Sequence, residues 1–272
     1  MSGKMTIAQF RKMIWNHYEK RGRHDMAWRK KRDPYRIVVS EVMLQQTQVS
    51  RVENKYPEFI RAFPNFASLA KAPLKDVLAA WQGMGYNRRA LYLKRIAEEV
   101  VRAHRGELPE APEALEKLPG IGMATARSIA AFAFDAPVAF IETNVRSVFL
   151  HHFFPGRTEV KDTQILPLVE QALDRARPRE WYWALMDYGA HLKGLGVNPS
   201  RASAHHAPQA KFAGSDRQAR GAIMKLLLAS GPRTIGDITR ETGMQEGRIR
   251  RNAANLAAEG MVRERRGKFV IP

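Results

Sequence analysis

Apolar residues recur at three- and four-residue spacing along most of the first 200 residues, which is typical of amphipathic helices. The periodic segments are separated by Pro, Gly or Asn/Asp turns. They span 6–17, 34–46, 48–63, 74–82, 88–104, 112–117, 123–134, 143–153, 162–175 and 180–192. No stretch before residue 200 alternates convincingly with a period of two, so the sequence predicts a mainly α fold.

The pattern changes after residues 194–216, which are polar and rich in Gly, Pro and Ser and are expected to form a loop and linker. Three helices and a small hairpin are predicted beyond this linker. They cover 217–229, 234–242 and 245–259, then 261–265 and 268–271 around Arg266-Gly267. A helix followed by a helix-turn-helix and a β-wing is typical of a winged helix, which often places its third helix in the DNA major groove.

The charge of this C-terminal part favours contact with DNA. Residues 211–272 contain 13 Lys and Arg against 6 Asp and Glu. The predicted third helix carries Arg248, Arg250 and Arg251, and such cations neutralise backbone phosphates. We therefore expect these arginines to contact DNA. The alternative is a winged helix that contacts protein.

Composition narrows the class of protein. The chain has 272 residues, of which 44% are hydrophobic, so it can form a packed core in one large domain or two modest ones. Its formal charge of +18 points to a polyanion, with double-stranded DNA as the first candidate and an unengaged basic surface as the alternative. No cysteine is present, which excludes disulfides, thiolate zinc sites and cysteine-held iron–sulfur clusters. Without a signal peptide or an apolar run near 18 residues, we expect a cytoplasmic protein and no membrane contact.

Glu41 occupies an unusual position for a carboxylate. Its helix begins with Asp33 as N-cap and Pro34 at the first helical position. The residues at three- and four-residue spacing around it are Ile37, Val38, Leu44 and Gln45. Glu41 is therefore expected in the apolar stripe, where burial raises the pKa of a carboxyl group toward the protonated state that a general acid needs. The alternative is a glutamate at the edge of the stripe that reaches water or pairs with an arginine.

A glycine-rich turn joins two predicted helices at Leu118-Pro119-Gly120-Ile121-Gly122. Gly120 and Gly122 permit a tight turn, and the amides at the start of the next helix, near Ala124 and Thr125, would face a phosphate. This spacing is typical of a helix-hairpin-helix element, which holds DNA by its backbone and often binds a monovalent cation through hairpin carbonyls. A plain interhelical turn is the alternative.

A second carboxylate, Glu142, follows the apolar run 137–141 and precedes a predicted helix. Glu142 or Thr143 should cap that helix, and a carboxylate at a helix start stays ionised more readily. One neutral and one ionised carboxyl group form a recurrent arrangement for cleaving glycosidic bonds through a cationic transition state. The alternative is that Glu142 is only a cap.

Four sequence strings now identify a resemblance. They are Ser40-Glu41-Val42-Met43-Leu44-Gln45-Gln46-Thr47-Gln48-Val49, Trp81-Gln82-Gly83-Met84-Gly85-Tyr86, Leu118-Pro119-Gly120-Ile121-Gly122 and Leu185-Met186-Asp187-Tyr188-Gly189-Ala190. In this order they resemble the adenine-specific mismatch DNA glycosylases of the helix-hairpin-helix superfamily, over residues 6–193. The resemblance implies two α-helical lobes with a cleft between them. We expect a glycosylase domain over 1–213, with a six-helix lobe at about 34–136 and a second lobe from about 1–33 and 137–205, and a winged helix over 214–272.

The resemblance also implies roles for individual residues. Glu41 matches the catalytic acid that protonates the departing adenine, and Asn144 matches an Asn beside the second catalytic carboxylate. Gln46 and Tyr86 match residues that wedge into the base stack when the nucleotide is extruded. The matches to residues of the base pocket are Trp28, Arg29 and Asp187.

Four departures from the family pattern matter. Lys193 occupies the position of the first of four cysteines that usually hold an iron–sulfur cluster, so the following loop must be held by packing and hydrogen bonds; no metal is expected. The second carboxylate is Glu142 instead of Asp. Ala124 supplies no amine, so no Schiff-base lyase activity is expected. The usual C-terminal domain that recognises 8-oxoguanine is replaced by the predicted winged helix.

The sequence therefore predicts a monofunctional DNA glycosylase without an organic cofactor, acting first on adenine opposite G or 8-oxoguanine. A glycosylase for thymine, uracil or a modified pyrimidine is the alternative among enzymes. A non-catalytic DNA-binding protein is the alternative from another class. A third idea is that the winged helix binds a protein partner, which the sequence does not identify.

Overall fold

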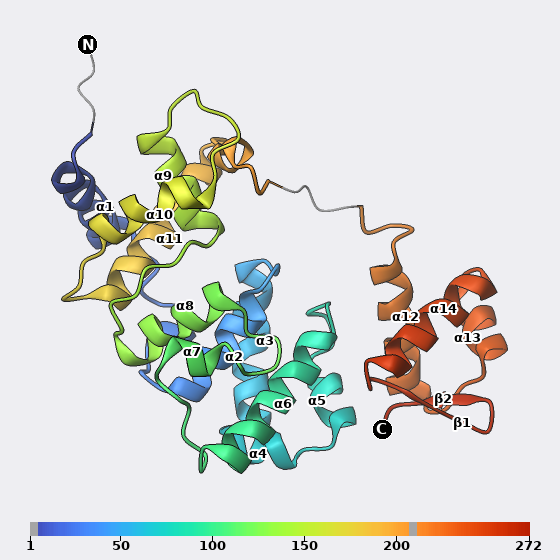
Figure 1. Ribbon diagram of the computed structural model, residues 1–272. Coiled ribbons are helices and arrows are strands. Elements are labelled where there is room, and N and C mark those ends of the chain that lie inside the picture. Colours follow the sequence, from blue (N-terminus) through green and yellow to red (C-terminus); the bar gives the residue numbers. More distant parts are fainter. Residues whose placement is uncertain (1–4, 207–210) are drawn as a thin grey trace. The chain divides into compact units, whose positions relative to one another are not determined.

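The computed structural model describes residues 5–206 and 211–272 and is built mainly of helices (Figure 1). In chain order the elements are α1 (Ile7–Arg21), η1 (Ala27–Arg29), α2 (Pro34–Leu44), α3 (Val49–Ala62), α4 (Phe66–Lys71), α5 (Leu74–Ala80), α6 (Arg88–Ala103), α7 (Pro112–Leu115), α8 (Met123–Phe134), α9 (Thr143–Phe153), α10 (Asp162–Ala172), α11 (Pro178–Gly194), η2 (Pro199–Ala202), α12 (Asp216–Ser230), α13 (Ile235–Thr242), α14 (Glu246–Ala258), β1 (Arg263–Arg265) and β2 (Lys268–Val270).

The contacts divide the chain into two units. The first comprises Met1–Ile37, Glu110–Lys117 and Ile121–Pro208, and the second comprises Val38–Pro109, Leu118–Gly120 and Gln209–Pro272. None of the described helices is both long and apolar enough to span a membrane.

In the first unit, α1 packs against α10 and α11, and α9 packs against both of them as well. At the centre lies Phe10 of α1, which is fully buried, with its ring 5.0 Å from Phe149 of α9 and 6.2 Å from Trp181 of α11. The next residue, Arg11, donates to the carbonyl of Ala172 at 2.9 Å, at the end of α10. Terminal carbonyls have no partner within their own helix, so Arg11 caps α10 and ties it to α1.

In the second unit, α4 and α5 pack on α6, and α5 also contacts α3. Trp81 follows α5 and is fully buried, with its ring 5.8 Å from that of Phe59 on α3. Its indole N–H donates to the Gly85 carbonyl at 3.1 Å. This hydrogen bond fixes the loop between α5 and α6.

Helix α4, which has six residues, was not predicted from the apolar periodicity. Its start is encoded locally, because Asn65 and Ser68 form a capping box in which each side chain accepts from the other's main-chain N–H, at 2.9 and 3.2 Å. A helix this short has too few turns to show a repeating apolar pattern. The helix predicted over 34–46 ends earlier, at Leu44, because Gln46 adopts a left-handed φ of 53°.

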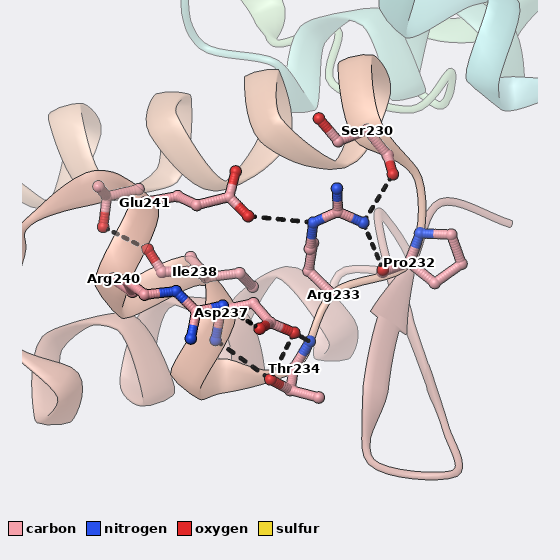
Figure 2. Close-up of polar contacts among 9 residues, drawn as sticks. Ser230, Pro232, Arg233, Thr234, Asp237, Ile238, Arg240 and Glu241 are labelled. Carbon is pink, nitrogen blue, oxygen red and sulfur yellow. Dashed lines mark hydrogen bonds and ion pairs between the residues drawn. The ribbon is translucent and has the colours of Figure 1, made fainter.

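The three helices and the hairpin predicted after the linker are present. Helices α12, α13 and α14 pack on one another, and β1 pairs antiparallel with β2 (Figure 1). Arg233 joins several of these elements. Its side chain donates to the Ser230 carbonyl at 2.7 Å and to Glu241 at 3.2 Å (Figure 2). Its main chain pairs with that of Phe269 of β2. Figure 2 also shows the Thr234 end of α13, where the Asp237 side chain accepts from the Thr234 hydroxyl at 2.7 Å.

Candidate active site

Helix α2 begins as the sequence predicts and carries Glu41. The main-chain N–H of Tyr35 donates to the side chain of Asp33 at 3.0 Å, which caps the helix. Val38 and Val42 are buried, whereas Glu41 is partly exposed. Glu41 therefore lies at the border of the buried stripe, where a carboxyl group can be partly desolvated and still meet a ligand.

Glu142 is the N-cap of α9. Its Oε1 accepts from the Val145 main-chain N–H at 2.7 Å, and its Oε2 accepts from the Asn144 side-chain amide at 3.2 Å. The capping position predicted from the sequence is confirmed, and the structure brings Glu142 and Asn144 together. Each carboxylate oxygen is thus held by one donor from the first turn of the helix.

The ionisation of Glu142 reflects two opposing effects. Burial raises the pKa of the Glu142 carboxyl group above its ordinary value; the hydrogen bonds from Asn144 and Val145 and the charge of Arg146 lower the pKa but do not cancel the effect of burial. The position of Glu142 at a helix start predicted the opposite direction of the pKa shift, because that pattern does not reveal burial. Arg146 is itself held in a bidentate pair with Asp162, at 2.7 Å for both bonds.

The backbone of α11 passes very close to this site. A Cβ on Gly189 would lie 2.7 Å from the Asn144 Cβ and 2.8 Å from the Asn144 carbonyl oxygen. Only glycine leaves room for this approach. Gly189 belongs to the string Leu185-Met186-Asp187-Tyr188-Gly189-Ala190, but no local signal in the sequence reveals that it faces the start of α9.

Asp187 of α11 is buried in a cluster of arginines. Arg29 donates two hydrogen bonds to its carboxylate, at 2.8 and 2.9 Å, and Arg23 donates from its main chain at 2.8 Å and from its side chain at 2.7 Å. Burial acts to raise the pKa of Asp187, but the bonds and charges of Arg29 and Arg23 outweigh it and lower the pKa. The resemblance implied that the carboxylate of Asp187 lines the base pocket. Its side chain is only 1% exposed, however, so it does not present a free oxygen to a pocket.

The same cluster orients Arg29. Its guanidinium lies 5.2 Å from the ring centroid of Trp183, and Trp28 beside it is 7% exposed. Arg23 and Trp183 were not predicted, because no spacing in the sequence links them to Asp187.

Gln46 and Tyr86 share an unusual backbone conformation. Both have a left-handed φ, 53° and 47°, although neither is glycine. Gln46 is exposed, and Tyr86 is 36% exposed. Both lie in the second unit, where the buried Arg89 hydrogen-bonds to the chain next to each of them. Arg89 was not predicted from the sequence.

The glycine-rich turn precedes α8 as predicted. Gly120 has a φ of 74°, and a Cβ there would collide with the ring of Tyr92, so glycine is required. Gly122 is the N-cap of α8 and makes no side-chain cap. Gly122 and Ala124 are exposed and Thr125 is half-buried. The first amides of α8 are therefore open to an anion.

The three arginines of α14 hold acidic partners within their own part of the chain. Arg248 and Arg251 approach Asp216 at 3.4 and 3.5 Å, and Arg250 approaches Glu246 at 2.7 Å. Arg248 also donates to the carbonyl of Gly214. The spacing of Glu246 and Arg250 is that of an ordinary i,i+4 helix pair, whereas no local spacing links Asp216 to Arg248 and Arg251. All three pairings lower the charge available to DNA.

The segment 194–206, which would carry a cluster in the family pattern, is held by main-chain hydrogen bonds. The Val160 N–H donates to the Ala202 carbonyl at 2.9 Å, and the Ala204 N–H donates to the Val160 carbonyl at 3.0 Å. The chain has no thiol, so these residues do not fit an iron–sulfur cluster. Across the described residues, no group of three or more His, Asp or Glu side chains is placed to hold a metal ion.

Known proteins are similar to this chain in sequence and in fold. The family model for an HhH-GPD superfamily base excision DNA repair protein matches residues 39–172. Adenine DNA glycosylase of Mycobacterium tuberculosis (strain ATCC 25618 / H37Rv) is 30% identical over 300 residues, which cover 100% of this chain and 96% of that protein. Adenine DNA glycosylase of Buchnera aphidicola subsp. Baizongia pistaciae is 33% identical over 199 residues, or 72% of this chain and 56% of that protein.

Solved structures of DNA-repair proteins have a fold similar to that of this chain. A thermostable thymine-DNA glycosylase matches with a TM-score of 0.60 and 25% identity, over 68% of this chain and 86% of that one. A non-covalent endonuclease III–DNA complex matches with a TM-score of 0.56 and 16% identity, also over 68% of this chain and 86% of the other, and shows the fold alone.

The sequence and the fold thus identify a base excision DNA repair protein of the HhH-GPD superfamily. Within that superfamily, the chain belongs to the family of adenine DNA glycosylases. Its aligned part spans about half the length of some curated relatives, 56% for the Buchnera protein and 40% for that of Rattus norvegicus.

Gly189→Ala should displace the start of α9 and destabilise the protein by about 1–3 kcal/mol, because the new methyl group meets backbone atoms of Asn144. Gly194→Ala on the same helix is the matched control, since a Cβ there meets nothing within 4 Å. Urea unfolding of both variants tests this. Equal stability of the Gly189 variant and wild type would contradict the close approach.

Proposed function

We propose that this protein is a monofunctional DNA glycosylase that excises adenine opposite G or 8-oxoguanine by hydrolysing the N-glycosidic bond. The observation that supports the proposal is that the chain carries two carboxyl groups, Glu41 and Glu142, at the positions that the family resemblance matches to the catalytic acid and to the second carboxylate. Glu41 lies at the border of a buried helical stripe, and Glu142 is held by Val145 and Asn144 at a helix start. Such a pair suits the cleavage of a glycosidic bond through a cationic sugar.

Each step has a candidate residue. The amides at the start of α8 hold a phosphate, and Gln46 and Tyr86 fill the space left by the extruded nucleotide. The base enters a pocket that includes Trp28 and Arg29, with Asp187 acting through Arg29.

Glu41 then protonates the leaving base. Glu142, in its ionised form, stabilises the oxocarbenium-like sugar, and one of the two carboxyl groups guides the water that adds to it. The product is an abasic site.

Two finer proposals concern the hairpin. Ala124, in the first turn of α8, carries no amine, so no imine forms and the abasic strand stays intact until alkali is added. The carbonyls of the turn around Gly120 hold a monovalent cation, in keeping with its left-handed backbone.

We also propose that residues 214–272 form a winged-helix domain that binds duplex DNA chiefly through its hairpin. In the register of the hairpin, Arg265 pairs with Lys268, and Glu264 pairs with the buried Phe269. Because side chains alternate along a strand, these two pairs lie on opposite faces of the hairpin. The exposed basic residues of the hairpin are Arg263, Arg265, Arg266 and Lys268. Unlike the arginines of α14, these four form no ion pair with any part of the chain that the structure describes.

A panel of duplexes, each with one mispair, should show release of adenine opposite G or 8-oxoguanine after alkali treatment. Glu41→Gln should slow release by at least ~100-fold while DNA binding persists, because the general acid is lost. Release of pyrimidines alone would favour the alternative substrate class. If wild type and Glu41→Gln bind alike and neither releases a base, the protein is a DNA-binding protein only.

The rate of base release should fall with decreasing pH at a higher pH than an ordinary glutamate would give, because burial raises the pKa of Glu142 and its ionised form is the active one. Single-turnover rates across about pH 4–8 test this. The free energy of unfolding should depend on pH in the opposite direction to the rate. The folded state binds the Glu142 proton more tightly than the unfolded state does, so the free energy of unfolding falls as the pH rises through the raised pKa. Glu142→Gln should release the base slowly at every pH, and its free energy of unfolding should not show this decrease with rising pH.

Salt dependence tests the hairpin. Replacing Arg265 and Lys268 with Gln should reduce the slope of log affinity against log salt by up to about 2, because each phosphate contact contributes about 0.9. Arg240→Gln on α13, whose arginine is 74% exposed at its side chain, is the control and should leave the slope unchanged. If the hairpin variant keeps the wild-type slope while Arg250→Gln reduces it, α14 is the DNA-binding element instead.

A further inference from the structure

Arg89 is a buried cation without a carboxylate partner among the described residues. It lies in the first turn of α6 and is 7% exposed. Both burial and the positive end of the helix disfavour a cation there. Burial lowers the pKa of Arg89 to about 10. An arginine in this position therefore needs strong compensation from its neighbours.

That compensation comes from two separate loops. The Nη1 atom of Arg89 donates to two carbonyls in the last turn of α2, those of Val42 at 3.0 Å and Met43 at 2.8 Å, and to the carbonyl of Gln45 just after the helix at 2.6 Å. The Nη2 atom donates to the Thr47 hydroxyl at 2.9 Å and to the carbonyls of Met84 at 3.2 Å and Gly85 at 3.1 Å. One guanidinium thus joins the loop after α2 to the loop before α6.

These bonds surround the two left-handed residues. Arg89 binds Gln45 and Thr47, the residues on either side of Gln46, and it binds the Gly85 carbonyl immediately before Tyr86. Its guanidinium also lies 5.5 Å from the ring centroid of Tyr86. Non-glycine residues with positive φ carry a cost and persist only where surrounding contacts fix them.

We propose that Arg89 is a positioning residue that holds the loops of Gln46 and Tyr86 together as one preformed wedge for opening the DNA base stack. The inference rests on the proposed function, in which these two residues fill the space of the extruded nucleotide. A preformed wedge does not lose conformational entropy when the complex forms, so more of the binding energy is left for base extrusion.

Lysine cannot replace Arg89 in this role. Its ammonium has three donors at one point, whereas the planar fork of arginine reaches acceptors on two loops at once. Arg89→Lys therefore keeps the charge and removes the bridge. Arg102→Lys is the matched control, because Arg102 is on the same helix, is 73% exposed at its side chain and pairs with Glu99 alone among the described residues.

Hydrogen exchange of the free full-length protein is the first test. Arg89→Lys should increase exchange in peptides covering residues 44–48 and 83–87 and leave the rest near wild type, and Arg102→Lys should change neither loop. Thr47→Val removes both hydrogen bonds of the Thr47 hydroxyl, the one accepted from Arg89 and the one donated to the Gln45 carbonyl. It should loosen 44–48 alone, which keeps the test available if Arg89→Lys does not fold. Unchanged exchange in both loops would overturn the proposal.

Single-turnover release of adenine is the second test. On a duplex with one A·G mispair, Arg89→Lys should be slower by about 10- to 100-fold. The loss should be smaller when the adenine lies opposite an abasic site, because extrusion then costs less. Gln46→Ala should also cost less in the Arg89→Lys background than in wild type, because the two residues act together. Equal losses on both duplexes and additive effects would overturn the proposal.

The two hypotheses fail in different ways. If wild type releases no adenine from any duplex, the proposed function is wrong, while the exchange data still decide whether Arg89 holds the two loops. If wild type is active and Arg89→Lys matches it, the enzyme assignment stands and the role of Arg89 is wrong.

Discussion

The contact between Gly189 and Asn144 is the constraint on which the candidate active site depends. It lets the backbone of α11 pass the first turn of α9 without an intervening side chain. That turn presents the donors that hold both oxygens of Glu142. Glu142 can therefore be buried and still hydrogen-bonded, and its ionisation reflects the balance between the two. The chemistry of this carboxyl group is set as much by the packing of two helices as by the residue itself.

The protein buries arginines in two different ways. Arg29 meets the carboxylate of Asp187, and the pair has no net charge, which limits the cost of burial. Arg89 meets only carbonyls, a hydroxyl and aromatic rings, and so keeps its positive charge inside the protein. The first arrangement orients a side chain and joins η1 to α11. The second holds main-chain segments that have no regular structure of their own.

Much of the fold could be predicted from local pattern. The apolar periodicity located most helices, and the capping role of Glu142 followed from its place before α9. What could not be predicted depends on residues far apart in the sequence. Asp187 has its partners at Arg23 and Arg29, about 160 residues away, and no spacing rule connects them. The predicted direction of the Glu142 pKa shift was wrong for a related reason. A capping pattern in the sequence reveals the hydrogen-bond donors but not how deeply the carboxyl group is buried.

The main-chain hydrogen bonds that join residues 202–204 to Val160 have a consequence for the stability of this segment toward oxidants. A segment clamped by cysteine-bound iron would come loose when an oxidant attacked the cluster, and its assembly would wait for iron delivery. Here the clamp consists of two amide-to-carbonyl bonds, which peroxide does not break and which form as the chain folds. In this respect the fold of the segment depends neither on iron nor on the redox state of its surroundings.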